Sequence, residues 1–291
     1  MSGNGPGNGP LAIICGGGKF PFVVADAVAH SGRKPVLFAI LGWADADAVA
    51  RFPHHWFGLA RFGRFRRLAR QEGCRDVVII GTMLRPSLLQ LRPDLTTLFY
   101  MPRIARLLRG GDDHLLSGIG HIFEENGFRL VGAHQVAPGI LVPQGVLGAH
   151  APSARDQVDI DRGLGVIAAM GPFDVGQAVV VADGYVLAVE AAEGTDQMLA
   201  RVATLRRDRR VRLDGKVGVL VKAPKPAQDR RLDLPTIGNR TVAAAREAGL
   251  AGIAVEAGGT ITADFAELIA AADAAGLFVL GVPPPASRAA L

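Results

Sequence analysis

The chain has 291 residues, which at roughly 150 residues per domain predicts two domains. Apolar residues make up 49% and charged residues 20%, a composition that excludes global disorder. No apolar run approaches the roughly 18–20 residues of a membrane-spanning helix, and Met1–Pro10 lacks the features of a secretory signal. Two cysteines, Cys15 and Cys74, exclude a disulfide framework and a thiolate metal site. We therefore expect a cytoplasmic protein.

The formal net charge of +5 favours anionic partners such as phosphates, nucleic acids or acidic lipid headgroups. The stretch Arg61–Arg70 interleaves five arginines with Phe and Leu residues. This pattern is typical of a solvated helix face above an apolar stripe, or of a basic amphipathic helix that rests on an acidic membrane. No nucleic-acid-binding motif is present, so we expect no nucleic-acid partner.

The first half alternates short apolar strands with helices. The expected strands are Leu11–Cys15, Val36–Leu41, Val77–Gly81 and Phe128–Val131; the expected helices cover 21–30, 62–72, 102–108 and 112–126. Apolar strands that alternate with helices predict a parallel sheet covered on both faces. Residues 11–132 are therefore predicted to form a Rossmann-like domain, preceded by a flexible extension over 1–10.

Residues 133–152 are rich in Gly, Pro and Ala and are the predicted linker. A second domain is expected over 153–282, followed by a tail over 283–291. Asp183-Gly184 is a strong hairpin signal between two apolar strands. Further expected strands cover 217–221, 252–255 and 277–281, and expected helices cover 156–170, 195–205, 241–248 and 263–275. The fold class is thus two α/β domains, the second with a mixed sheet.

The glycine cluster Gly16-Gly17-Gly18 follows the first strand and precedes a helix, where backbone amides can approach an anion. The dinucleotide fingerprint is incomplete because Pro21 stands at the third glycine position, and no P-loop ending follows. A tight strand-to-helix turn and a substrate-binding role for Gly17 and Gly18 both remain open. The incomplete fingerprint disfavours a dinucleotide-dependent oxidoreductase.

Asp112 and Asp113 open an expected helix, where Asp112 is positioned as the N-cap and the carboxylates favour the helix dipole. Binding of a substrate group is the alternative. The seven histidines are scattered and form no pair with the spacing of a zinc enzyme, so we expect no histidine metal ligand.

Acidic residues follow the second strand of the expected hairpin. Glu190 and Glu193 stand where carboxylates face the usual crevice of an open α/β sheet, while Thr195 or Asp196 can cap the next helix. The longest polar stretch, Lys222–Gly238, follows the next strand. It holds two lysines, two arginines, an amide, two carboxylates and three prolines that restrict its conformations.

This donor set is suited to magnesium-assisted chemistry on a phosphate ester or anhydride. Carboxylates hold a hard divalent cation, and Lys and Arg neutralise phosphate oxygens. A zinc site would require His or Cys, which the stretch lacks. The expected cofactor is Mg²⁺, with Mn²⁺ as the second option. A non-catalytic nucleotide- or lipid-binding protein is the alternative from another functional class.

Several stretches together resemble a known family. They are Gly16-Gly17-Gly18 with Pro21, Gly111-Asp112-Asp113 with Leu115-Leu116, Gly132-Ala133-His134, Glu190 through Asp196, Lys222 through Gly238, and 248–254 with Glu256-Ala257-Gly258. The chain resembles the UDP-2,3-diacylglucosamine pyrophosphatases of lipid A biosynthesis, in the alphaproteobacterial-type family that is distinct from the calcineurin-like version.

The resemblance implies a magnesium-dependent hydrolase that forms UMP and 2,3-diacylglucosamine 1-phosphate (lipid X), with water attacking the β-phosphorus. It also implies that the lipid is held between two domains, and it places the family's essential aspartate at Asp233. We further expect peripheral contact with the inner membrane surface, and we count a homodimer among the partners.

The site assignments combine this resemblance with the chemistry of the motifs. The predicted catalytic residues are Asp233, Lys222, Lys225 and Gln228, and the predicted metal ligands are Asp233 and Glu190. The predicted substrate-binding residues are Gly17, Gly18, Asp112, Asp113, Glu193, Thr195, Asp196, Arg231, Thr236 and Gly238.

Overall fold

The computed structural model describes residues 7–83, 92–226 and 228–284. The chain forms two compact units: the first comprises Met1–Pro138 with Asp229–Asp233, and the second comprises Gly139–Gln228 with Leu234–Leu291. The boundary falls within the predicted linker, and the sequence did not indicate the transfer of Asp229–Asp233 to the first unit. Parts of the predicted extension (1–6) and tail (285–291) lie outside the described residues.

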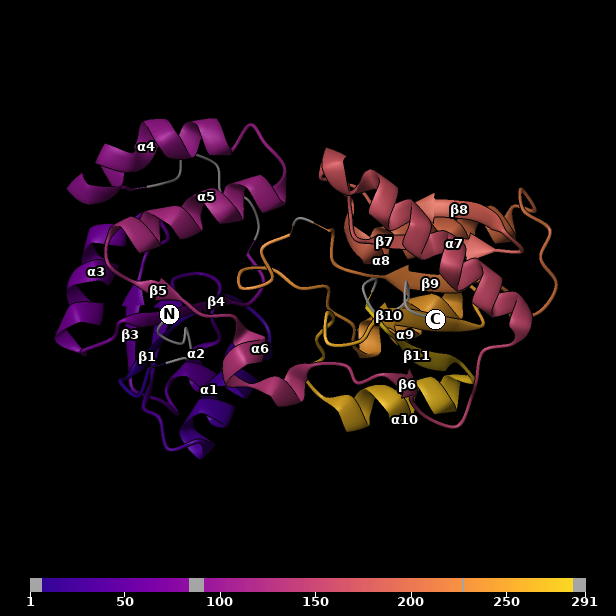
Figure 1. Ribbon diagram of the computed structural model, residues 1–291, viewed down its shortest axis with the longest axis horizontal. Helices are drawn as coiled ribbons and strands as arrows, with labels where there is room; N and C mark the ends of the chain where they lie inside the picture. Colours follow the sequence, from indigo (N-terminus) through magenta and orange to yellow (C-terminus); the bar gives the residue numbers. More distant parts are fainter. Residues whose placement is uncertain (1–6, 84–91, 227, 285–291) are drawn as a thin grey trace. The chain divides into compact units, whose positions relative to one another are not determined.

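The first unit contains a five-stranded, fully parallel sheet in the order β3-β2-β1-β4-β5 (Figure 1). Its strands are β1 (Leu11–Cys15), β2 (Pro35–Ile40), β3 (His54–Phe57), β4 (Asp76–Ile80) and β5 (Arg129–Leu130). This is the Rossmann strand order as far as its fifth strand, in which β1 lies at the centre. The predicted Rossmann-like fold class is confirmed.

Helices cover both faces of this sheet. They are α1 (Phe20–His30), α2 (Ala46–Val49), α3 (Phe62–Gln71), α4 (Leu95–Leu107), α5 (Asp112–Glu125) and α6 (Ala133–Val136). On one face, α3 and α5 pack through an aromatic cluster in which the Phe65 ring lies 4.8 Å from Phe38 and 5.3 Å from Phe123, between centroids. On the other face, α1 contacts β1 and β2.

The second unit contains a six-stranded mixed sheet in the order β6-β11-β10-β9-β7-β8. Its strands are β6 (Gly145–Val146), β7 (Ala178–Ala182), β8 (Tyr185–Val189), β9 (Val219–Lys222), β10 (Gly252–Glu256) and β11 (Phe278–Val282). Strands β9, β10 and β11 are parallel, and β7 is antiparallel to both β8 and β9. Strands β8, β9 and β10 therefore run in the same direction and end at the same edge.

Side chains of the buried strands alternate between two helical layers. Val179 and Val221 pack against α7 (Ala154–Met170), whereas Val180 and Leu220 pack against the opposite layer. That layer consists of α8 (Gly194–Arg207), α9 (Asn239–Glu247) and α10 (Phe265–Ala275), and two short 3-10 helices, Pro138–Ile140 and Gly171–Phe173, complete the described helices. The predicted mixed α/β second domain is confirmed.

Several expected boundaries differ from the structure. Asp112 is the first residue of α5 and Gly111 is its N-cap, so the predicted N-cap role of Asp112 is wrong. Helix α4 begins at Leu95 rather than Pro102, because the Asp94 side chain accepts a hydrogen bond from the Thr97 N–H and caps an earlier turn. Lys222 is the last residue of β9 rather than part of the following loop.

Candidate functional site

The carboxyl edge of the second sheet concentrates buried polar side chains. Among the described residues, eleven polar or charged residues are buried, and seven of them end or follow β8, β9 or β10. These seven are Glu190, Lys222, Lys225, Gln228, Glu256, Thr260 and Thr262. The carboxyl edge of parallel strands is where open α/β sheets place their ligands, so this edge is the candidate site in the second unit.

Lys222, Thr195 and Glu190 form a hydrogen-bonded chain at this edge. The Lys222 Nζ donates to the Thr195 Oγ1 at 2.9 Å and to the Thr236 carbonyl at 3.0 Å. The Thr195 hydroxyl in turn donates to the Glu190 Oε1 at 2.6 Å. Thr195 lies inside the first turn of α8, and neither it nor Asp196 caps that helix through its side chain, which corrects the predicted cap. The structure therefore brings four predicted residues together.

A second pair of contacts extends this cluster. The Lys225 ammonium pairs with the Asp174 carboxylate, and the Gln228 Oε1 accepts the Lys225 backbone N–H at 3.0 Å. The Gln228 Nε2 approaches the Gln177 Oε1 at 3.4 Å. Since the Gln177 backbone N–H donates to the Glu190 Oε2 at 2.9 Å, the two parts of the cluster are connected.

The segment before β7 is shaped to bring its side chains against this edge. Asp174 adopts a left-handed conformation at φ 53°, and Gly176 has a φ of 42°. A Cβ atom at Gly176 would lie only 2.1 Å from the Glu190 carbonyl oxygen, so no larger residue fits there without movement of the backbone. The tight turn thus holds Asp174 and Gln177 beside Lys225 and Glu190.

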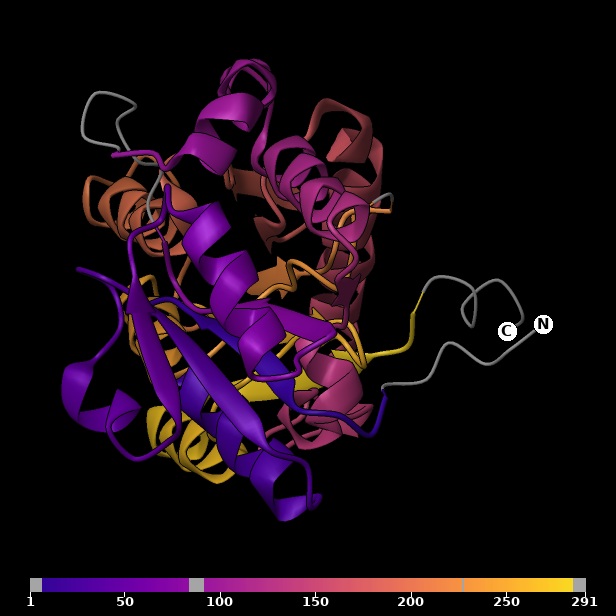
Figure 2. The ribbon, with the colours of Figure 1, turned by 90° about the vertical axis from the view of Figure 1, so that its left-hand side faces the viewer.

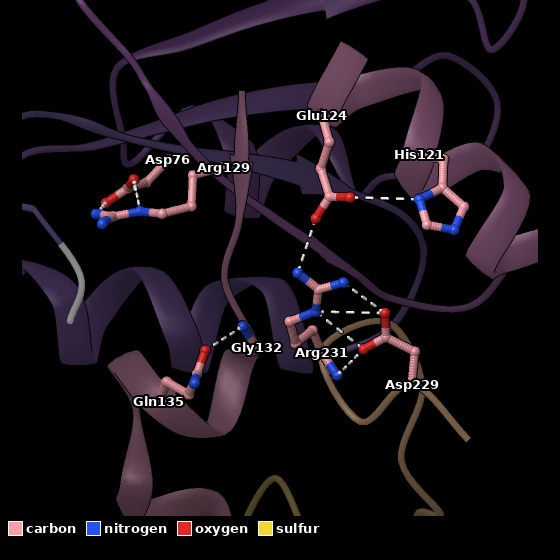
Figure 3. Close-up of polar contacts among 8 residues, drawn as sticks. All are labelled: Asp76, His121, Glu124, Arg129, Gly132, Gln135, Asp229 and Arg231. Carbon is pink, nitrogen blue, oxygen red and sulfur yellow. Dashed lines mark hydrogen bonds and ion pairs between the residues drawn. The ribbon is translucent and has the colours of Figure 1, made fainter. Parts of the chain in front are cut away.

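The segment Asp229–Asp233 is held in the first unit by Arg231 (Figure 3). The Arg231 guanidinium donates to both oxygens of Asp229, through Nε at 3.0 Å and Nη2 at 2.8 Å, and Nη1 donates to the Glu124 Oε1 on α5 at 2.8 Å. His121 lies 3.4 Å from the other Glu124 oxygen. Hydrogen bonds from Arg231 lower the pKa of Asp229 despite its partial burial. These ion pairs and the Leu232 side chain, which packs on the aromatic core, anchor the segment.

Asp233 follows this anchor directly and is the last residue of the segment in the first unit. Its backbone N–H donates to the Asp229 carbonyl at 3.2 Å, which closes a turn over residues 229–233. The side chain is half-buried. The position of the predicted essential aspartate is therefore fixed by the segment that Arg231 and Leu232 anchor.

His134 lies close to the same segment. A Cβ atom at Gly132 would meet the His134 ring at 2.4 Å and the Arg231 Cα at 3.3 Å, so ring and segment flank one glycine. The His134 Nδ1 is buried and makes no hydrogen bond among the described residues. Burial, with the nearby Arg230 charge, lowers the pKa of His134, and the ring is therefore neutral at pH 7.

Two other predicted substrate-binding residues, Gly17 and Gly18, lie in the turn after β1, which packs closely against the backbone that follows β4. The Gly17 N–H donates to the Thr82 carbonyl at 2.9 Å, and a Cβ atom at neighbouring Gly16 would lie 2.9 Å from Gly81, so the glycine turn allows two backbones to approach closely. Gly18 has a φ of 88°. A substrate role for Gly17 stays a prediction, and its N–H group is already used.

The remaining predicted residues lie at helix starts. Glu193 pairs with Arg201 at 2.8 Å, and Asp196 pairs with Arg240 at 2.5 Å. Gly238 is the N-cap of α9. The Asp113 Oδ1 lies 3.4 Å from the Asp229 backbone N–H, which connects the start of α5 to the anchored segment.

Sequence reasoning missed three residues that contact the predicted site residues, namely Asp174, Gln177 and Glu124, and a fourth buried residue at the same sheet edge, Glu256. Glu256 ends β10 and is 1% exposed, and a charged residue at the end of an otherwise apolar strand is a signal that could have been used. Glu124 and Asp174 contact their partners only through the tertiary fold, so their neighbours in the sequence give no such signal.

The carboxylates of the site bear on which metal ion the protein can hold. No group of three or more His, Cys, Asp or Glu side chains that could hold a metal ion occurs among the described residues. A complete zinc site made only by the protein would need such a group. Mg²⁺ uses one or two carboxylates and fills its other positions with waters and substrate phosphates, so carboxylates such as Asp233 or Glu190 fit it.

The first unit also contains an apolar cavity of about 170 Å³. The lining comes from the sheet and from α3, α4 and α5, and includes Phe62, Tyr100, Met101, Ile104, Leu116 and Ile119. A cavity of similar size and lining stays dry and binds small apolar molecules. The first unit therefore offers an apolar site, whereas the second unit offers a polar one.

Two family models match the chain: the LpxI N-terminal domain over residues 10–140 and the LpxI C-terminal domain over residues 143–280. The UDP-2,3-diacylglucosamine pyrophosphatase LpxI of Caulobacter vibrioides is 43% identical over 274 residues, which cover 94% of this chain and 98% of that protein. The resemblance inferred from the motifs is confirmed over both units, and the predicted enzyme class is that of the named relative.

Proposed function

Because the chain belongs to the LpxI family, we propose that it hydrolyses the diphosphate bond of UDP-2,3-diacylglucosamine in lipid A biosynthesis. The observation that carries this proposal is the identity to the named relative over nearly the whole of both chains. The buried cationic and acidic side chains at the carboxyl edge of the second sheet support it, because they are of the kind that phosphate chemistry requires.

In the proposed reaction, water attacks the β-phosphorus and the bond from that phosphorus to the bridging oxygen breaks. UMP leaves with the bridging oxygen, the water oxygen remains on 2,3-diacylglucosamine 1-phosphate (lipid X), and the water gives up a proton. Asp233 either accepts this proton or would serve as a ligand of the proposed metal ion. The anchored segment before it limits the positions that its carboxylate can adopt.

Lys222 and Lys225 are the proposed cationic groups for phosphate oxygens. An ammonium group has three N–H donors, and the Lys225 ammonium contacts the Asp174 carboxylate. Burial strengthens the interaction of such a charge with a phosphate relative to the same contact in water. Gln228 supports Lys225 by accepting its backbone N–H.

Mg²⁺ is the proposed cofactor, and Asp233 and Glu190 are its proposed protein ligands. When bound, the ion would neutralise charge that develops on the phosphoryl oxygens. Glu190 already accepts hydrogen bonds from Thr195 and from the Gln177 backbone. A carboxylate has about four lone-pair positions, so these contacts leave room for a cation.

The acyl chains require a different environment from the phosphates. We place part of at least one of them in the apolar cavity of the first unit, where the lining is almost entirely hydrocarbon. Each buried methylene group contributes roughly 0.8 kcal/mol to binding. Since the substrate comes from a bilayer, contact of the protein with the membrane surface is part of this proposal.

The deciding experiment is incubation of the full chain with UDP-2,3-diacylglucosamine in ¹⁸O-labelled water, with Mg²⁺ or with EDTA, and mass spectrometry of the products. We expect unlabelled UMP and ¹⁸O in the lipid phosphate, in the Mg²⁺ reaction only. Label in UMP would contradict attack at the β-phosphorus, and turnover after exhaustive chelation would contradict the metal. Saturable binding without release of UMP would identify a binding protein instead.

A further inference from the structure

Helix α4 exposes an apolar face that the aqueous surface of a protein normally avoids. Leu95 is 87% exposed, Phe99 is 79% exposed and Leu98 is 55% exposed. With Pro102, which is also exposed, they lie on one side of the helix because their spacing follows its period of 3.6 residues. Figures 1 and 2 show α4 on the outer side of α3 and α5, away from the sheet of the first unit.

Exposed arginines border this apolar face. The first turns of α3 and α4 are in contact: the Arg64 backbone N–H donates to the Asp94 Oδ2 at 3.0 Å, and a Cβ atom at Gly63 would lie 2.6 Å from the Thr96 hydroxyl. Arg64 and Arg67 point outward on α3, and Arg106 and Arg109 are exposed at and just beyond the end of α4. The surface thus combines large apolar side chains with cationic ones.

The opposite side of the same helix lines the apolar cavity. Tyr100, Met101, Ile104 and Leu108 alternate with the exposed residues and face the interior of the first unit. One helix therefore has an apolar outer face and an apolar inner face, with the cavity directly behind it. A helix between a bilayer and an internal apolar site would have this arrangement.

We propose that the outer face of α4, with the neighbouring arginines of α3, is the surface by which the protein docks on an anionic lipid bilayer. The apolar side chains would enter the boundary between headgroups and acyl chains, and the arginines would contact phosphates of the headgroups. This inference rests on the proposed function in that the docked helix is the one that borders the proposed acyl cavity. We call these residues the docking surface: Leu95, Leu98, Phe99, Arg64, Arg67, Arg106 and Arg109.

The positive charge of the docking surface favours an anionic bilayer over a second copy of the chain as its binding partner. In a twofold symmetric dimer the same patch meets itself, so its arginines would approach the arginines of the partner and repel them. An anionic bilayer instead presents phosphates to the arginines and hydrocarbon to the leucines and phenylalanine. Helix α4 has 13 residues, and no described helix is long and apolar enough to cross a membrane, so docking leaves the helix at the interface.

The test is cosedimentation of the full chain with vesicles of phosphatidylcholine alone or with one quarter phosphatidylglycerol. We expect the double variant Leu95→Gln/Phe99→Gln to lower the partition coefficient on anionic vesicles by at least about 10-fold. Arg64→Glu/Arg67→Glu should have an effect of similar size, and high salt should reduce the binding of the unmodified protein. The matched controls Val158→Gln/Phe173→Gln and Arg207→Glu/Arg212→Glu change exposed residues of the same kinds in the second unit and should bind as the unmodified protein does.

Hydrolysis assays separate this inference from the proposed function. The docking-surface variants should hydrolyse detergent-dispersed substrate at the unmodified rate but should turn over vesicle-embedded substrate more slowly. Circular dichroism and thermal unfolding check that they fold. Unchanged vesicle binding by both folded double variants would overturn the proposal. So would conversion of a dimer to a monomer by Leu95→Gln/Phe99→Gln with vesicle binding intact, because the face would then be a subunit interface.

Discussion

The first sheet buries a charged residue at the amino end of a strand, whereas the second sheet buries charged residues at the carboxyl ends of its strands. Asp76 begins β4 and pairs with Arg129 at the start of β5 (Figure 3). It also pairs with Arg33, just before β2. Lys222 and Glu256 end β9 and β10, and Glu190 follows β8. The two units therefore bury similar chemistry at opposite edges of their sheets.

The partners at the two edges differ as much as their positions do. Asp76 accepts hydrogen bonds from two arginines and from the Gly7 backbone N–H, at 2.6–2.9 Å, and this network ties the amino edge together. The carboxyl edge of the second sheet instead connects its charges through Thr195, Gln177 and Gln228. We therefore expect the charges at the amino edge of the first sheet to serve stability, and those at the carboxyl edge of the second sheet to serve the proposed reaction.

The largest effect is expected from Asp233→Asn. Loss of the carboxylate that we propose as proton acceptor or metal ligand should lower kcat by roughly 100- to 10,000-fold, measured as UMP release. Binding of lipid X, measured by calorimetry, should persist because the amide retains the shape of the carboxylate. The matched control Asp214→Asn changes an exposed aspartate of the second unit and should keep full activity. Normal turnover by Asp233→Asn would remove this residue from the mechanism.

Asp76→Asn tests the role of the buried charge at the amino edge of the first sheet. It removes the buried carboxylate charge that pairs with Arg33 and Arg129, and should lower the free energy of unfolding by about 3 kcal/mol at pH 7, measured by urea denaturation. The kcat of the folded fraction should stay unchanged. The control Asp26→Asn breaks an exposed pair with Arg51 and should cost less than about 1 kcal/mol. A large loss of kcat in Asp76→Asn would refute the division between the two edges.

The pH dependence of this effect has a defined sign. Burial alone would raise the pKa of Asp76, but hydrogen bonds from Arg129, Arg33 and Gly7 outweigh it and hold the pKa below its ordinary value. The stabilising contribution is thus present above the unfolded pKa of about 3.9 and is lost as the pH falls through the lower folded pKa. The difference in unfolding free energy between the unmodified protein and Asp76→Asn should therefore shrink below about pH 4.

Lys222→Met should lower kcat/KM by about 100-fold, because one buried cation no longer stabilises the phosphate charge. This reduction in kcat/KM should be the same for substrates with short and long acyl chains, since we place the acyl-chain site in the first unit and Lys222 lies in the second. Lys34→Met, which removes an exposed lysine paired with Glu72, is the control and should retain normal kinetics. A factor that grows with acyl length would contradict the separation of lipid and phosphate sites.

Met101→Trp should give the smallest kinetic effect. Unlike the effect of Lys222→Met, it should depend on the length of the acyl chains. The larger side chain fills the apolar cavity and should raise KM for the long-chain substrate by about 10-fold, with little change for a diacetyl analogue. Met170→Trp, at the end of α7 in the second unit, is the control and should show normal KM values for both. Equal effects of Met101→Trp on KM for the two substrates would contradict the placement of an acyl chain in this cavity.

The sequence was sufficient for the parallel sheet and for the β7–β8 hairpin. The apolar runs of β1, β2 and β4 have no polar alternation, as strands buried on both faces require. Asp183 and Gly184 have φ values of 54° and 69°, so the expected turn residues adopt the left-handed conformations that a tight hairpin needs. In both cases the information lies within a few neighbouring residues.

Other features depend on contacts between residues far apart in the chain. Strand β3 begins with His54-His55 and lacks an apolar run, so only its pairing with β2 defines it. In α4, Pro102 resembles a helix start but lies in the interior. The predicted substrate-binding role of Arg231 stays a prediction, but its pairing with Glu124, which lies 107 positions earlier in the chain, was not foreseen. Single-sequence patterns do not contain that information.

The return of Asp229–Asp233 to the first unit affects the order in which the protein can fold during synthesis. Residues up to Pro138 emerge from the ribosome first, but their unit lacks Leu232 on its aromatic core and the Arg231 partner of Glu124 until much of the second unit has been made. At roughly 5–20 residues per second, this delay lasts about ten seconds. Neither unit is a continuous piece of chain, and the first fold can be completed only after translation has reached Asp233, within the second unit.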